Sequence, residues 1–139
     1  MLNLHPLFVH FPVALLPVAL ILEIAALLLN KEEISRAGWW NQVLGTIALA
    51  AAVVSGLFAK ETVVLSDAAR EVIATHEQLA FLAAALSGGL LFWRISCRGK
   101  IPDKQRYLFL LLLALGAGLV IMCGWFGGEL VFRLGVGVR

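Results

Sequence analysis

Apolar residues fill four long stretches of the chain, and short polar segments separate them. The pattern predicts four membrane-spanning helices, over residues 7–29, 39–59, 73–95 and 106–126. Each stretch is close to the roughly 20 residues that a helix needs to cross the hydrocarbon core of a bilayer. Only helices and closed barrels satisfy their backbone polar groups in lipid, and runs rich in alanine and leucine favour helices. We therefore predict an all-α fold, an integral membrane four-helix bundle.

The four spans leave room for a single domain, residues 1–139, in which residues 127–139 form an interfacial tail. The composition agrees, because 61% of the residues are hydrophobic and 14% are charged, whereas soluble domains carry roughly 25% charged residues. We expect membrane lipid around the chain and no nucleic-acid partner. No serine or cysteine has a histidine at a matching position and depth, which disfavours a free-standing hydrolase.

Basic residues are shared unequally between the two faces of the predicted bundle. Seven belong to the face with the two short loops: Lys31, Arg36, Arg94, Arg98, Lys100, Lys104 and Arg106. Four belong to the face with both termini: Lys60, Arg70, Arg133 and Arg139. The positive-inside rule places the richer face in the cytoplasm. We therefore expect a multi-pass protein of the inner (cytoplasmic) membrane with both termini outside.

Two features of the spans concern packing. Small residues recur at three- or four-residue spacing along the second span: Gly45, Ala48, Ala52 and Gly56. Such spacing lets a neighbouring helix approach closely, which favours association of helices in lipid. Pro12 and Pro17 lie inside the first span. Because each proline removes a backbone hydrogen bond, we expect the outer half of this helix to be bent or loosened.

The chain has three histidines, His5, His10 and His76, and all fall on the face with the termini. Counting about 20 residues outward from the opposite ends of the first and third spans reaches His10 and His76, at similar depth. These two helices run in the same direction and can lie diagonally across a four-helix bundle. Two imidazoles across a bundle core are the arrangement that bis-histidine haem b requires. We therefore predict His10 and His76 as ligands of haem b.

An alternative interpretation uses all three histidines. His5 lies a turn or more further out, and with His10 and His76 it would complete a three-histidine metal site. Three imidazoles with a water in the open position suit zinc or copper. The residues alone leave the haem and the metal site both open.

Glu23 is a second unusual residue, because an ionised carboxylate inside a membrane span is costly. It lies about two turns from the inner end of the first span, and Arg94 lies at the inner end of the third. The matching depth predicts an ion pair between them. A proton-relay role for Glu23 is the alternative.

Motifs at both ends of the chain resemble a known family. His5-Pro6-x-x-x-His10-Phe11-Pro12 opens the chain, His76 begins the third apolar run, and Gly127-Gly128-Glu129-Leu130-Val131-Phe132-Arg133-Leu134-Gly135-Val136-Gly137 closes it. Together they resemble the predicted membrane proteins grouped as domain of unknown function 2231, over essentially the whole chain. The resemblance implies a four-span protein, and some members are fused to or encoded beside Rieske iron–sulfur or cytochrome c modules.

The resemblance also bears on individual residues. It implies that His5, His10 and His76 occupy the family's histidine positions, while the chain departs from the family at Leu134, where many relatives have a histidine. It points to electron transfer with other redox membrane subunits or a cytochrome c-like partner. The leading hypothesis is a small redox subunit that binds haem b between the first and third helices near the outer face. A zinc or copper site and a cofactor-free structural or assembly subunit are the alternatives, and homo-oligomerisation is left open.

Overall fold

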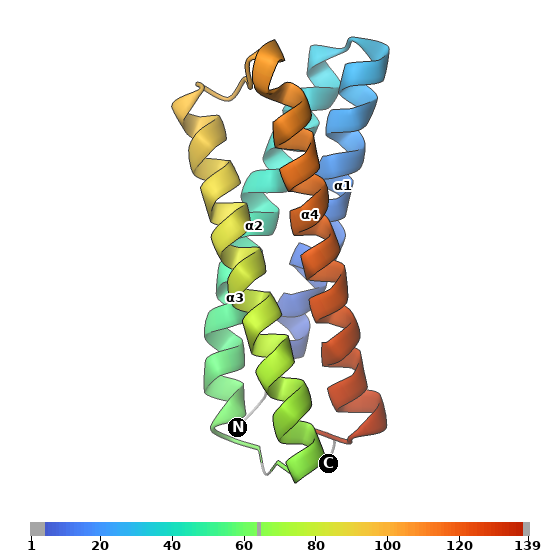
Figure 1. Ribbon diagram of the computed structural model, residues 1–139, viewed down its shortest axis with the longest axis vertical. Helices are drawn as coiled ribbons and strands as arrows, with labels where there is room; N and C mark the ends of the chain where they lie inside the picture. Colours follow the sequence, from blue (N-terminus) through green and yellow to red (C-terminus); the bar gives the residue numbers. More distant parts are fainter. Residues whose placement is uncertain (1–4, 64, 138–139) are drawn as a thin grey trace.

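The computed structural model describes residues 5–63 and 65–137, which form helices and no strands (Figure 1). The elements follow in the order α1 His5–Leu29, α2 Glu32–Lys60, α3 Asp67–Ser96, α4 Asp103–Gly128 and a π-helix, η1, Glu129–Arg133. All four α-helices are long and apolar enough to cross a membrane. The predicted all-α membrane bundle is therefore confirmed.

The helices alternate in direction along the bundle. α1 packs on α2 and α4, α3 packs on the same two helices, and α1 and α3 lie diagonally opposite each other (Figure 1). The α1–α2 and α3–α4 connections lie together at one end, which we call the basic end. The beginning of α1, the α2–α3 connection and η1 lie at the other end, which we call the histidine end. The diagonal placement of α1 and α3 agrees with the expectation from the sequence.

The bundle is apolar on its outer surface as well as in its core. The centre is filled by a compact cluster: Leu16, Leu49, Ala83 and Val120. Large hydrophobic side chains are also exposed on the outside of every helix, as at Leu28, Phe58, Phe92 and Leu111. Such a surface suits lipid, where apolar side chains need no cover from water. The core must therefore be held by close packing and by its few polar contacts.

Small residues bring α2 close to α1. A Cβ atom on Gly45 would lie 2.9 Å from side-chain carbons of Leu16, so the contact requires glycine at this position. This supports the packing role predicted for the small residues of the second span. α1 itself continues without a break through Pro12 and Pro17, so the expected loosening does not interrupt the helix.

Several helices extend beyond the apolar stretches that predict them. α2 begins at Glu32, and α3 begins at Asp67, where the Ser66 hydroxyl accepts a hydrogen bond from the Ala69 N–H at 3.3 Å. The segment predicted to be an interfacial tail begins as helix. Residues 127 and 128 still belong to α4, and η1 continues the helix to Arg133, with an ion pair from Arg133 to Glu129. The glycines therefore interrupt this helix less than expected, and helix-breaking residues are tolerated in membrane helices where neighbouring groups satisfy the backbone.

Candidate functional site

The imidazoles of His5 and His76 lie beside each other inside the histidine end. Their ring centres are 6.4 Å apart and their planes are 87° to each other. His5 comes from the first turn of α1, and His76 from the third turn of α3. Because α1 and α3 are diagonal helices, the two rings approach each other across the bundle. The structure thus brings together two of the three histidines, from the two helices that the sequence predicts.

His5 is oriented by α2. Its Nδ1–H donates to the Ser55 hydroxyl oxygen at 3.1 Å, and the Ser55 hydroxyl donates in turn to the Ala52 carbonyl at 3.0 Å. The donor role of Nδ1 follows from this chain, because the serine proton is already used. A histidine fixed through Nδ1 would bind a metal through Nε2. Sequence reasoning missed Ser55, although a hydroxyl within an apolar span is a usable signal.

His76 is oriented by α4. Its Nδ1–H donates to the carbonyl oxygen of Cys123 at 3.0 Å, and the thiol of Cys123 lies 3.4 Å from the same nitrogen. A carbonyl can only accept, so this contact also assigns the proton to Nδ1. Each imidazole is therefore held by a helix next to its own, and all four helices contribute to the arrangement.

Two glycines leave space beside the imidazoles. A Cβ on Gly56 would lie 2.9 Å from Cε1 of His5, and a Cβ on Gly127 would lie 3.4 Å from Cε1 of His76. The first distance is too short for a real contact, whereas the second is close to an ordinary one. Gly56 is thus required for the observed position of His5, and Gly127 is required less strictly.

A cavity of about 430 Å³ opens around the two rings, and its walls are mainly apolar. This volume is within the roughly 300–1,000 Å³ of typical cofactor and ligand pockets. The walls come from all four helices and from η1. Lys60 and Glu77 belong to the lining and form an ion pair of 2.8 Å between α2 and α3. The site is an apolar chamber with the two oriented imidazoles of His5 and His76 and one ion pair, and His10 also belongs to its lining.

His10 does not meet His76, contrary to the expectation from depth. Its side chain is exposed, although it belongs to the lining of the cavity, and its Nδ1–H donates to the carbonyl oxygen of Pro6 one turn earlier. Five residues turn an α-helix about 140° past a full turn, so His5 and His10 point to different sides of α1. Depth alone could not separate them, because it ignores the direction in which a side chain leaves the helix.

The three-histidine metal site is not assembled either. Within residues 5–63 and 65–137, no group of three or more histidine, cysteine, aspartate or glutamate side chains could hold a metal ion. His10 belongs to the lining of the same cavity, but its Nδ1–H is bonded to the Pro6 carbonyl and it joins no such group. Zinc or copper with three histidine ligands therefore does not fit the observed arrangement.

Comparison with known proteins identifies the family. The family model described as predicted membrane protein (DUF2231) matches residues 1–139. The chain belongs to the DUF2231 family. No curated protein and no solved structure matches it.

Leu134 is the position where the resemblance led us to expect a histidine in this DUF2231 protein. Its side chain is partly buried and packs on a small cluster of Ala69, Ile73 and Leu130. It does not belong to the lining of the histidine cavity. The absence of a histidine here therefore leaves the pair of His5 and His76 intact.

The predicted pair of Glu23 and Arg94 is confirmed at the basic end of this DUF2231 protein. Arg94 Nη2 lies 2.7 Å from Glu23 Oε1, and only 2% of Arg94 is exposed. The guanidinium also donates to the Gln42 side-chain oxygen, to Ser35 and to the Gly99 carbonyl. These contacts join α1, α2, α3 and the α3–α4 connection, which supports a structural role.

Proposed function

We propose that this membrane protein is a small electron-transfer subunit that holds haem b between His5 and His76 at the histidine end. The observation that carries the proposal is the pair of oriented imidazoles on diagonal helices. The proposed ligands are therefore His5 and His76, in place of the pair of His10 and His76 that was predicted from the sequence.

The separation of the rings supports a shared iron. A metal–nitrogen bond to histidine is about 2 Å long, so the centres of two imidazoles that held one iron between them would be about 6 Å apart. The observed 6.4 Å agrees with this value. The planes of the two rings are 87° to each other, and a shared iron does not require them to be parallel.

The surrounding residues perform the tasks that such a site requires. Ser55 and the Cys123 carbonyl fix the two rings and keep the proton on Nδ1, which leaves ligation to Nε2. Apolar walls keep water away from the imidazoles, and Gly56 makes room for the His5 ring. Haem b held by two imidazoles supplies a one-electron carrier with no open coordination position, which suits electron transfer.

The position of the site leads to the partners that we propose. If the basic end is cytoplasmic, the histidine end is at the outer face of the inner membrane. The protein would then exchange electrons with other redox membrane subunits or with a cytochrome c-like partner outside the membrane.

An optical spectrum of the purified protein tests the presence of the cofactor. The protein should be purified in detergent from cells that make ample haem, and it should show a Soret band that shifts on reduction. Haem extraction should give about one haem b per chain, as expected for one site with two axial ligands. A colourless, iron-free protein would contradict the proposal. Co-purifying redox subunits without a cofactor would then favour a structural subunit.

A further inference from the structure

A second cavity of about 430 Å³ lies at the basic end, far from the histidines. Its walls are the last two turns of α1, the first two turns of α2 and α4, Arg94 near the end of α3 and the α3–α4 connection. It is therefore open beside both short connections, where α1 and α4 are neighbours. Nothing in the proposed electron-transfer role uses this cavity.

The most buried charged side chains of this cavity form an ion pair with each other. Arg94 and Glu23 both belong to the lining, and their 2.7 Å ion pair is almost completely buried. The other nitrogens of Arg94 donate to protein oxygens. The inner part of the cavity is thus neutral and rigid, and it is not the place where a charged ligand would bind.

The outer part of the cavity has one positive charge in excess. Lys100 pairs with Glu32 at 2.7 Å, and Arg106 lies 3.5 Å from Asp103. Lys31 completes the charged lining, and it has no carboxylate partner among the described residues. Four basic and three acidic side chains line the cavity in total, which leaves a formal charge of plus one. This charge complements a single phosphodiester group.

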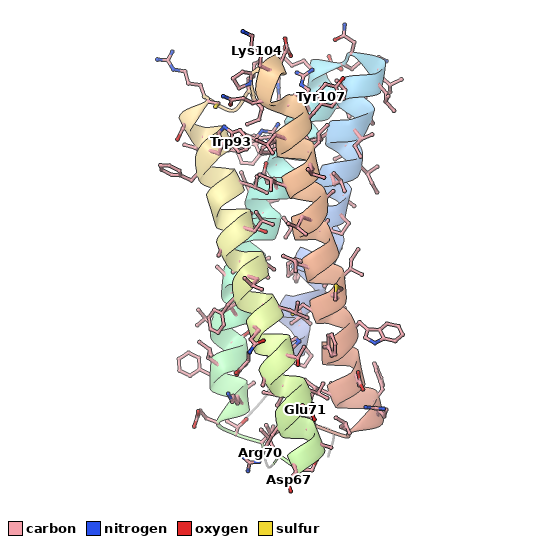
Figure 2. All side chains as sticks on the ribbon, in the orientation of Figure 1. Asp67, Arg70, Glu71, Trp93, Lys104 and Tyr107 are labelled. Atoms are coloured by element: carbon pink, nitrogen blue, oxygen red, sulfur yellow. The ribbon has the colours of Figure 1, made fainter. Side chains whose placement is uncertain are left out.

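The cavity also offers apolar contact directly below these charges. Leu27 and Leu110 belong to its lining, and the neighbouring outer surfaces of α1 and α4 expose Leu28 and Leu111. Figure 2 shows Trp93 and Tyr107 at this end together with Lys104, and tryptophan and tyrosine are typical of the membrane–water interface. A ligand here would have its charged group beside Lys31 and its apolar part along α1 and α4.

We propose that this cavity binds the headgroup of an anionic phospholipid, with Lys31 as the cation that meets the phosphate. The acyl chains would lie along the exposed apolar side chains of α1 and α4. Cationic pockets between membrane helices favour anionic lipids by charge as well as by apolar contact. The proposal is independent of haem binding, because no residue of the histidine cavity takes part in it.

The test compares lipids on detergent-purified, delipidated protein. The melting temperature should be followed by circular dichroism with phosphatidylglycerol, with phosphatidylcholine of the same chain length, or with inorganic phosphate. Native mass spectrometry of the same samples should count the retained lipids. Phosphatidylglycerol should raise the melting temperature most and should remain bound.

Three variants identify the cation. Lys31→Gln should weaken phosphatidylglycerol retention roughly fivefold, the effect of one lysine near a membrane surface, and Lys31→Arg should restore it. Lys104→Gln is the matched control, because Lys104 is exposed at the same end but does not line the cavity. The proposal would be overturned if the two lipids raised the melting temperature equally, or if inorganic phosphate alone raised it as much as phosphatidylglycerol. Full lipid retention by Lys31→Gln would overturn it as well.

Discussion

Gly56 shows how a single residue determines the geometry of the histidine pair. Its neighbour Ser55 holds the His5 ring, and Cε1 of the ring lies 2.9 Å from where a Cβ on residue 56 would be. Space and orientation are therefore supplied by two consecutive residues of α2.

Replacing Gly56 by alanine tests this point. Gly56→Ala should displace the His5 ring, destabilise the protein by about 1–3 kcal/mol through overpacking and lower the haem content. Gly127→Ala is the matched control, because its Cβ would be 3.4 Å from His76, close to an ordinary contact. Thermal unfolding in detergent and haem extraction give both readouts. Equal haem content in the two variants would contradict the role assigned to Gly56.

The sequence predicted which type of residue forms the site more easily than which two histidines come together. The rarity of histidine and the depth of the spans indicated a site on one face of the membrane. The buried positions of α1, Pro12, Leu16, Ala19 and Ala26, follow a helical repeat that also includes residue 5 but not residue 10. That repeat could have selected His5 from the sequence. The supporting contact from the Cys123 carbonyl could not be predicted, because every residue has such a group.

At the scale of the helices, the pair of Glu23 and Arg94 ties α1 to α3 across the basic end. The sequence predicts it because an ionised group within a span must find a partner at its own depth. The additional contacts from Arg94 to Gln42 and Ser35 bring α2 into the same network. The pair therefore fixes the relative position of three helices.

Neutralising Glu23 should destabilise the bundle. Glu23→Gln leaves the buried guanidinium of Arg94 without its counter-charge, and such a change costs about 3–5 kcal/mol. Glu32→Gln is the control, since its ion pair with Lys100 is solvent-exposed and should matter little. Thermal unfolding in detergent compares them. If both variants melt alike, Glu23 and Arg94 do not hold the helices together.

The number, order and direction of the helices could be predicted from the apolar stretches, because length and composition suffice for a membrane span. The residues at which the helices begin and end could not be predicted in this way. Hydropathy does not report the polar turns by which α2 and α3 extend beyond the apolar stretches. The glycines near the end of α4 were expected to end the helix, yet α4 and η1 continue through them.

At the scale of the whole molecule, the two ends of the bundle differ in chemistry. The basic end has the excess of cations and the buried ion pair, and the histidine end has the apolar chamber with the two imidazoles. The charge difference predicts a fixed orientation in the membrane, with the basic end in the cytoplasm.

Cys97 provides a test of this orientation, because it ends α3 at the basic end. In intact spheroplasts of a bacterial host, a membrane-impermeant maleimide should leave Cys97 unlabelled until the cells are permeabilised. A cysteine introduced by Arg70→Cys, at an exposed position of the histidine end, should be labelled at once. Labelling of Cys97 in sealed spheroplasts would reverse the predicted topology.

The central claim is that His5 and His76, and not His10, form the cofactor site. The most direct measurement is the reduced-minus-oxidised spectrum of His5→Ala, His76→Ala and His10→Ala, purified in parallel and checked for helix content by circular dichroism. We expect His10→Ala to keep the spectrum and the haem content of the original protein. His5→Ala and His76→Ala should each lose the spectrum while remaining helical. Loss of haem in His10→Ala, with retention in His5→Ala, would contradict the account.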